Sequence, residues 1–202
     1  RPVFEASVKH RVIRRDGTVP ASIARNEDLP KLQKAAGALE SKNIHVYAGN
    51  ERISPYAINW PAISKSNFRY TLRQDPGPDN ALGVIKFMFP NKFSIYIHDT
   101  PSKGLFARSS RTFSHGCMRV QDPIELGAVI LGAQGWSADR IRKVVASGKK
   151  TVVNLETPIP VHVTYLTAWV NKDGSVNFRD DVYGRDKRLK DGIAATHLVQ
   201  EG

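Results

Sequence analysis

The sequence predicts a mainly β fold with α-helical decoration, and three observations support that class. Short apolar segments rich in Val, Ile, Phe and Tyr recur along the chain, bounded by Gly, Pro, Asn and Asp. Apolar residues at helical spacing are confined to one early segment and to a pair of segments after residue 121. The 202 residues, 41% hydrophobic and 24% charged, suffice for one large domain or for one domain with an insertion.

The first 41 residues predict one strand and one helix. Residues 3–13 alternate enough for a strand, and residues 14–18 supply a turn. Residues 20–28 show no regular period, so we expect an irregular segment there. A helix is predicted over residues 30–41, because apolar side chains recur there three and four positions apart: Leu29, Leu32, Ala35, Ala36 and Leu39.

The middle of the chain predicts short strands and rigid turns. We expect strands over residues 44–47 and 68–72, with a turn and a tethered aromatic side chain at residues 54–61. Residues 74–80 are rich in Pro, Gly, Asp and Asn and predict a rigid loop.

The clearest hairpin is predicted from residues 83–89 and 93–98, joined by residues 90–92. Side chains alternate between the two faces of a strand. Ser94, Tyr96 and His98 therefore share one face, and Phe93, Ile95 and Ile97 share the other.

The last third of the chain predicts two helices and three strands. A helix over residues 122–132 would begin at Asp122 and Pro123, and a second would run from its cap at Ser137 to about residue 147. Strands are expected over residues 151–155, 161–170 and 175–178, the last two joined by a turn at 171–174. We assign no element after residue 178.

The charge of the chain indicates an anionic partner. The net charge is +11, which suits nucleic acid, an anionic wall polymer or a membrane surface. The basic residues are dispersed and lack an aromatic RNA-binding motif or zinc-finger spacing, so we expect no nucleic acid. No apolar run approaches the roughly 20 residues of a membrane helix, and no signal peptide is visible. We expect a trimmed or mature fragment, for which the missing signal does not indicate the cytosol.

Cys117 is the only cysteine, and its neighbours predict a catalytic nucleophile. His115 lies two positions before it and His98 nineteen positions before it. An imidazole and nearby positive charge help a thiol to ionise. If the chain is extended, His115 and Cys117 share a face about 6–7 Å apart, which is long for direct proton transfer. A sole cysteine also suits an oxidising compartment.

The partners of this nucleophile follow from strand geometry. The side chain of Asp99 points away from its neighbour His98, so a backbone carbonyl is the better group to orient the imidazole. Gly116 and Cys117 offer backbone N–H groups for an oxyanion, because a glycine lets substrate approach closely. Arg119 shares the face of Cys117 and could grip a substrate carboxylate.

Two other interpretations of the same residues stay open. The cysteine could be a small buried apolar residue, and Arg119 a member of a structural ion pair. His98, Asp99, His115 and Cys117 could instead bind zinc, although the sequence has no CxxC or HExxH pattern. We expect neither a metal nor a cofactor.

His98 followed by Ser114-His115-Gly116-Cys117-Met118-Arg119 resembles the motif of the L,D-transpeptidases, YkuD-type enzymes of the bacterial envelope that cross-link peptidoglycan. Three further segments are similar to the Gram-negative branch that carries a lid insertion: residues 75–83, residues 97–101, and residues 167–169 with 181–184. The resemblance covers nearly the whole chain. It implies a β-sandwich catalytic domain over residues 1–20 and 75–202, and a lid segment over residues 21–74.

The resemblance also implies roles for the residues of the motif. His98 would activate Cys117 and be held by the backbone carbonyl of Asp99, while His115 would shape the site and Gly116 would supply the oxyanion N–H. Arg119, Ser114 and Tyr96 are the candidates for substrate binding. The implied reaction is acyl transfer from a tetrapeptide stem, with release of D-Ala and formation of a 3→3 diaminopimelate cross-link. Carbapenems would acylate the same thiol, and the enzyme would work in the periplasm.

Other activities remain possible at this point. With water as acceptor the same site would be an L,D-carboxypeptidase, and with a protein substrate it would release wall-anchored proteins. A catalytically silent peptidoglycan-binding module and a zinc hydrolase are the alternatives of a different class.

Overall fold

The computed structural model describes residues 4–13, 17–77 and 79–200. Contacts divide the chain into one unit of residues 7–159 and another of residues 1–6 with 160–202. Strands dominate and helices decorate them, so the predicted fold class is confirmed. None of the described helices combines the length and apolar character needed to cross a bilayer.

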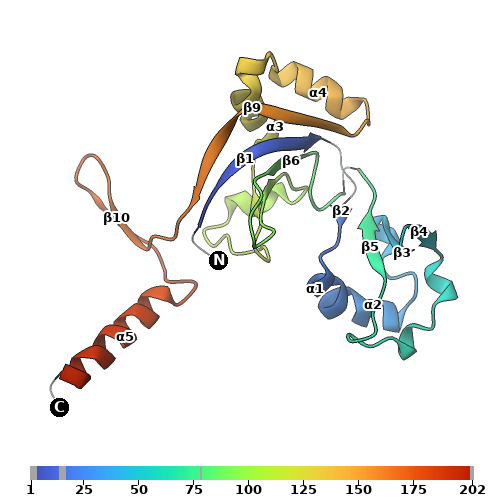
Figure 1. Cartoon of the computed structure of the whole chain (residues 1–202), viewed down its shortest axis with the longest axis horizontal. Helices are drawn as coiled ribbons and strands as arrows, with labels where there is room; N and C mark the ends of the chain where they lie inside the picture. The colour runs from blue at the N-terminus through green and yellow to red at the C-terminus, as the bar shows by residue number, and fades with distance from the viewer. Residues whose placement is uncertain (1–3, 14–16, 78, 201–202) are drawn as a thin grey trace. The chain divides into compact units, whose positions relative to one another are not determined.

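Residues predicted for the active site lie in or next to a five-stranded sheet, part of which is labelled in Figure 1. Its strand order is β8-β7-β6-β1-β9, and β6 is antiparallel to both β1 and β7, whereas β7 and β8 are parallel. Parallel neighbours need a long crossover, which residues 99–117 supply. The strands are β1 Phe4–Ile13, β6 Ile85–Met88, β7 Ile97–His98, β8 Met118–Arg119 and β9 Thr151–Val163.

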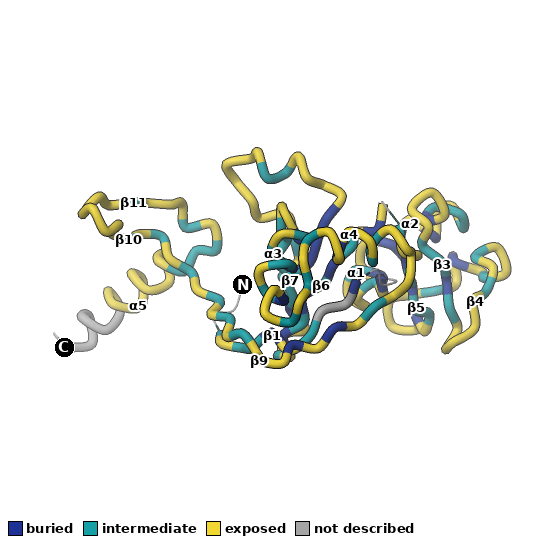
Figure 2. Tube along the Cα trace, turned by 90° about the horizontal axis from the view of Figure 1, so that it is seen from above, coloured by how far each residue is buried: buried dark blue, intermediate teal, exposed yellow. Residues whose placement is uncertain are grey.

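The core of this sheet is formed by strand and helix residues together. Ile13 and Phe87 are fully buried, as are Leu131 of α3 (Pro123–Leu131) and Ile141 of α4 (Ala138–Ala146). Figure 2 shows buried positions of residues 7–159 in strands, helices and loops alike. Next to α3, Gln134 in η6 (Gly132–Gln134) donates to the carbonyl of Asn154 at 3.0 Å and so joins the helices to β9.

A second, four-stranded sheet has the order β2-β5-β3-β4. Its strands are β2 Gly17–Thr18, β5 Thr71–Gln74, β3 Ile44–Ala48 and β4 Glu51–Ile53. Between β2 and β3 runs a helical segment made of α1 Ala21–Ile23, the π-helical turn η1 Ala24–Asp28 and α2 Leu29–Lys34. Three short 3₁₀ turns complete this region: η2 Glu40–Lys42, η3 Pro55–Ala57 and η4 Trp60–Ala62.

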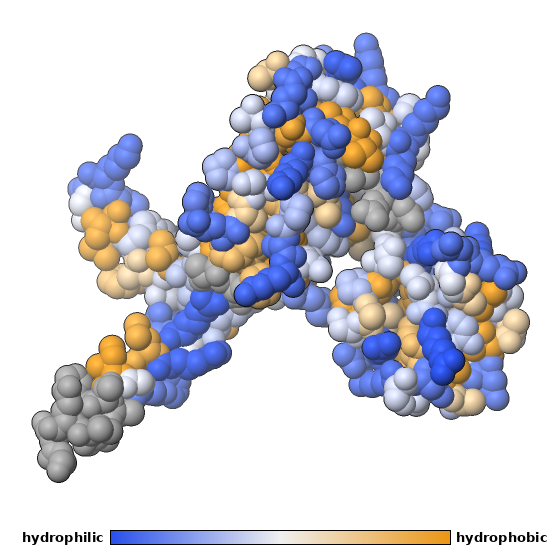
Figure 3. Space-filling model, in the orientation of Figure 1, coloured by the Kyte–Doolittle hydropathy of each residue, from blue (hydrophilic) through white to orange (hydrophobic). Residues whose placement is uncertain are grey.

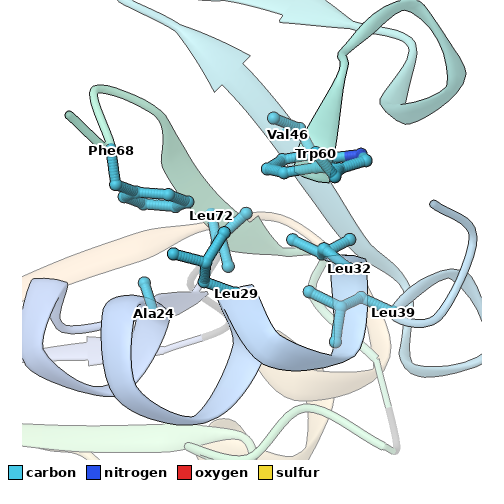
Figure 4. Close-up of a cluster of buried hydrophobic side chains, with 8 residues drawn as sticks. All are labelled: Ala24, Leu29, Leu32, Leu39, Val46, Trp60, Phe68 and Leu72. Atoms are coloured by element: carbon cyan, nitrogen blue, oxygen red, sulfur yellow. The ribbon is translucent and has the colours of Figure 1, made fainter. Parts of the chain in front are cut away.

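Residues 21–74, which the sequence predicted as a lid and which we call the lid segment for that reason, have a hydrophobic core of their own (Figure 4). Trp60 is buried, and its indole N–H donates to the carbonyl of Pro55 at 2.8 Å, which is the tethered aromatic that the sequence predicted. The sheet also includes β2, which lies before residue 21. The core residues are Ala24, Leu29, Leu32, Leu39, Val46, Trp60, Phe68 and Leu72.

The unit that contains residues 160–202 is a hairpin followed by a helix. β10 Ala168–Val170 pairs antiparallel with β11 Val176–Phe178, and α5 spans Arg185–Gln200. The carboxylate of Asp181 accepts hydrogen bonds from the backbone N–H groups of Arg185, Asp186 and Lys187. No side chain between residues 160 and 194 is fully buried, and Figure 3 shows apolar side chains exposed on the hairpin.

Several predicted elements were wrong in the first half of the chain. Residues 21–28 are helical instead of irregular. The helix predicted over residues 30–41 ends at Lys34, because Ala35 adopts an extended conformation, with φ −153° and ψ 118°. Leu39 is buried nevertheless, so the apolar spacing marked core residues correctly but not a continuous helix. Residues 17–18 form β2, and residues 14–16 and 78 of the predicted turn and loop lie outside the described residues.

The elements after residue 83 agree better with the prediction from the sequence. The hairpin of residues 83–98 exists, but its strands are shorter, because Asn91 bonds to the backbone of Phe89, Phe93 and Ile95 and holds residues 89–95 in a loop. Ser137 caps α4 as predicted, whereas Asp122 stands at the start of α3 without a side-chain cap bond. Residues 151–163 form one long strand instead of two, and α5 was missed.

Candidate active site

Cys117 directly precedes β8, the strand that pairs in parallel with β7, and β7 ends at His98. In this parallel pair His98 lies opposite Arg119, and the N–H of Met118 donates to the carbonyl of Tyr96 at 3.0 Å. Paired residues of neighbouring strands share a face, so His98 and Arg119 lie on the same face of the sheet. Tyr96 and Cys117 each lie one residue before these strands, and an extended chain there would put them on that face too. Diagonal neighbours on adjacent strands are about 7–8 Å apart at the backbone, a gap that a histidine side chain can span.

His98 is buried, and its ring is held by the backbone. Its Nδ1 forms a short hydrogen bond with the carbonyl oxygen of Asp99. Because a carbonyl only accepts, Nδ1 carries the proton and Nε2 is left with its lone pair. Burial lowers the pKa of His98, and the charges of Arg119 and Lys86 add to this, against the raising effect of the Asp99 carbonyl. The ring is therefore neutral at pH 7 and able to accept a proton.

The carboxylate of Asp99 is used to fix the backbone around that histidine. One oxygen accepts from the Lys103 ammonium at 2.6 Å and from the N–H of Thr100 at 2.7 Å, and the other accepts from the N–H of Val84 at 2.8 Å. Asp99 is itself buried. Its side chain thus contacts the chain around it, and its carbonyl contacts His98.

The turn before Cys117 is closed by Ser114. The Ser114 hydroxyl donates to the carbonyl of Cys117 at 2.6 Å and accepts from the N–H of Gly116 at 3.3 Å. Gly116 has φ 156°, a conformation that residues with a side chain rarely adopt. In this state Ser114 stabilises the turn, and its predicted contact with substrate remains a prediction, as does the oxyanion role of Gly116.

The same face of the sheet carries positive charge. The ammonium of Lys86 lies 3.4 Å from the centre of the Tyr96 ring, which in turn lies 5.6 Å from the ring of His98. The guanidinium of Arg119 donates to the carbonyl of Phe113 at 3.4 Å, and its buried Nε has no hydrogen-bond partner among the described residues. A buried donor without a partner is costly, so Arg119 is prepared to bind an anionic or carbonyl group.

His115 contacts a residue of the segment 21–74. Its Nε2 lies 2.7 Å from a carboxylate oxygen of Glu27, and its side chain is 68% exposed. The sequence analysis missed both Glu27 and Lys86. Lys86 could have been found from the hairpin register, because it lies opposite His98. Glu27 could not, because 88 residues separate it from His115 and no periodicity links them.

The arrangement suits nucleophilic catalysis by a thiol. A neutral histidine whose Nε2 carries a lone pair, a cysteine next to the neighbouring strand and nearby cations are the components of thiolate acyl transfer. Over the described residues, no group of three or more His, Cys, Asp or Glu side chains is placed to hold a metal ion.

Comparison with known proteins agrees with this chemistry. Residues 2–163 match the family model described as YkuD, L,D-transpeptidase catalytic domain. The chain is also 33% identical over 189 residues to a Haemophilus influenzae protein named "Putative L,D-transpeptidase". That alignment covers 93% of this chain but only 38% of the relative, so the chain spans well under half of that protein's length. The chain belongs to the L,D-transpeptidase family defined by the YkuD catalytic domain, whose fold is of the β-sandwich type.

Proposed function

We propose that this protein is a cysteine L,D-transpeptidase that forms 3→3 cross-links between peptidoglycan stems. The observation that supports the proposal is a buried, backbone-held His98 on the strand that pairs with the segment directly after Cys117, in a chain of this family. A silent binding module would have no use for a histidine kept in its basic form.

The first half of the reaction is acylation of Cys117. Nε2 of His98 takes the thiol proton, and the thiolate attacks the carbonyl carbon of the bond between diaminopimelate and the terminal D-Ala of a tetrapeptide stem. The N–H groups of Gly116 and Cys117 stabilise the oxyanion once Gly116 is released from Ser114. His98 then returns its proton to the leaving amine, and D-Ala departs.

The second half transfers the acyl group to the side-chain amine of a diaminopimelate on another stem. Arg119, with its buried unpaired Nε, is suited to bind a carboxylate of the donor stem. Lys86 and Tyr96 extend this cationic and aromatic surface. A carbapenem, whose ring carbonyl takes the place of the donor carbonyl, acylates Cys117 in the same way.

Substrate and location follow from the same proposal. The substrate is a wall polymer whose stems carry carboxylates, which fits the net charge of +11. We place the enzyme in the periplasm, where that polymer lies, and assign it a part in maintaining cell shape. The lid segment, with its own core and most of its own sheet, would cover the site of the catalytic domain formed by residues 1–20 and 75–202.

The test is mass spectrometry of the products formed from a disaccharide-tetrapeptide that contains meso-diaminopimelate. The expected products are a cross-linked dimer and free D-Ala, together with carbapenem mass added at Cys117. Tripeptide without dimer would assign an L,D-carboxypeptidase instead. No product and no adduct would refute the enzyme and leave a binding module.

A further inference from the structure

A contact between a carboxylate and an imidazole joins residues 21–74 to the turn that precedes Cys117. Oε1 of Glu27 lies 2.7 Å from Nε2 of His115, and His115 is two residues before Cys117. The side chains are 46% and 68% exposed, respectively. Exposed contacts of this kind add little to stability. The contact matters here for its place, because it connects the lid segment with the residue two positions before Cys117.

The structure around Glu27 fixes where its carboxylate lies. Glu27 belongs to the π-helical turn η1, a rare conformation that is frequent at functional sites. On either side of it, Ala24 and Leu29 are buried in the lid core, and Asp28 pairs with Lys31 at 2.8 Å. The turn is therefore anchored on its inner side, while Glu27 projects from it toward His115.

The charge of Glu27 differs from that of the rest of the site. Lys86 and Arg119 make the surface around His98 cationic, which repels an amine in its ammonium form. The Asp99 carboxylate is buried and is already used in three hydrogen bonds within the chain, so it is poorly accessible to the ammonium of an incoming stem. The carboxylate of Glu27 is half exposed, and its several lone pairs can accept a further donor beside His115.

We propose that Glu27 and His115 form the acceptor subsite, where Glu27 binds the ammonium group of the incoming stem and His115 takes its proton. This inference rests on the proposed transpeptidase function and adds how the enzyme selects an amine over water. Specificity for a charged acceptor would then come from the lid segment, and donor binding from the cationic sheet face.

The transfer moves two protons of the ammonium and replaces a C–S bond by a C–N bond. Nε2–H of His115 is donated to the Glu27 carboxylate, so the ammonium gives one proton to Nδ1 of His115, and the imidazolium that results is stabilised by Glu27. The free amine attacks the thioester carbonyl carbon, a C–N bond forms, and the C–S bond breaks with its electron pair leaving on the sulfur of Cys117. The second proton of the amine passes to His98, which returns it to the thiolate, and His115 releases its proton to solvent.

The experiment compares Glu27→Gln with the unmodified chain on the disaccharide-tetrapeptide and measures the ratio of dimer to tripeptide. Both products arise from the same acyl-enzyme, so any effect on acylation cancels in the ratio. We expect the ratio to fall by about tenfold, because glutamine keeps the size of the side chain but loses the charge that attracts the ammonium. An unchanged ratio would overturn the acceptor subsite while leaving the transpeptidase function standing.

Glu5→Gln is the matched control. Glu5 forms an exposed pair with His162 at 2.9 Å, of the same chemistry but outside the candidate site. Its substitution should leave the ratio within about twofold of the unmodified chain. A similar fall in both variants would mean that a general loss of negative charge is responsible, and would also overturn the proposal.

A binding measurement separates the two proposals. The chain acylated by a carbapenem is titrated with a disaccharide-tripeptide, which has the acceptor amine but no donor bond. We expect Glu27→Gln to raise the dissociation constant about tenfold. Equal binding by both proteins would refute the acceptor subsite. Absence of dimer from the unmodified chain would refute the transpeptidase and the subsite with it.

Discussion

At the scale of single residues, the protonation of His98 is the central property of the site. Burial lowers the pKa of His98, and the charges of Arg119 and Lys86 act in the same direction, so the imidazole binds its proton only below the ordinary histidine range near 6.5. As the pH falls from 7, the basic form should persist through pH 6.5. NMR of the imidazole nitrogens over a pH titration should show the midpoint of His98 below that of a model imidazole. A midpoint at or above the ordinary value would contradict the burial and charge seen around the ring.

The two histidines should differ in the acylation step. We expect His98→Ala to slow carbapenem acylation of Cys117 by about 10²–10⁴-fold, because it removes the base. His115→Ala should slow it far less, because His115 is exposed and paired with Glu27. The measurement is the rate of appearance of the adduct mass. Equal losses in the two variants would mean that His98 is not the base.

At the scale of elements, we expect the absence of a side chain at Gly83, just before β6, to matter for the position of His98. Gly83 has φ +57°, and a Cβ there would lie 2.2 Å from a carboxylate oxygen of Asp99. Gly83→Ala should therefore displace Asp99, and with it the carbonyl that orients His98. We expect a loss of stability of about 1–3 kcal/mol and slower acylation, measured by denaturant unfolding and by adduct formation.

Gly77→Ala is the control for that substitution. Gly77 lies in the preceding loop, and a Cβ there would meet no atom within 4 Å. It should change neither stability nor rate appreciably. If Gly83→Ala behaved like Gly77→Ala, the Asp99 carboxylate would not be what positions the histidine.

The lid segment should respond to a cavity in its own core. Leu32 is fully buried among Leu29, Leu39 and Trp60, so Leu32→Ala should cost about 2–5 kcal/mol. Hydrogen exchange should show lost protection in β3 and β5, while β6 in the five-stranded sheet keeps its protection. Equal loss in both sheets would mean that the two cores unfold together.

The elements also show where sequence patterns succeed and fail. The early helix was misplaced because burial of Leu39 does not require a helix, only a chain that returns to the core after Ala35. The sequence analysis missed α5 because its apolar residues do not gather on one face; its start depends on Asp181, whose hydrogen bonds only the structure shows. Features that depend on a contact within a few residues were predicted correctly, such as the Ser137 cap, which accepts a hydrogen bond from Arg140.

At the scale of the whole molecule, the site was predictable where the motif is local and not where it depends on long-range contacts. The motif around His98 and Cys117 indicated the chemistry, because His98 lies on β7 and Cys117 directly precedes its neighbour β8. The contact between Glu27 and His115 depends on how residues 21–34 fold, which no local pattern reports. The residues that we propose to discriminate between acceptors were therefore not recognisable as a pair from the sequence.

The net charge predicts that binding to peptidoglycan, the proposed substrate, depends on salt. With 30 Lys and Arg against 19 Asp and Glu, the chain should bind isolated peptidoglycan partly through long-range attraction to stem carboxylates. Salt screens such attraction, since the Debye length falls from about 10 Å at 0.1 M to about 3 Å at 1 M. Co-sedimentation with peptidoglycan should show severalfold less protein bound at 0.5 M than at 0.05 M NaCl, and no such loss in sucrose of equal osmolality. Because the basic residues are dispersed, single Lys→Gln changes such as Lys149→Gln should each have a small effect. Binding that is indifferent to salt would mean that the sheet face around Cys117, and not the overall charge, holds the chain on its polymer.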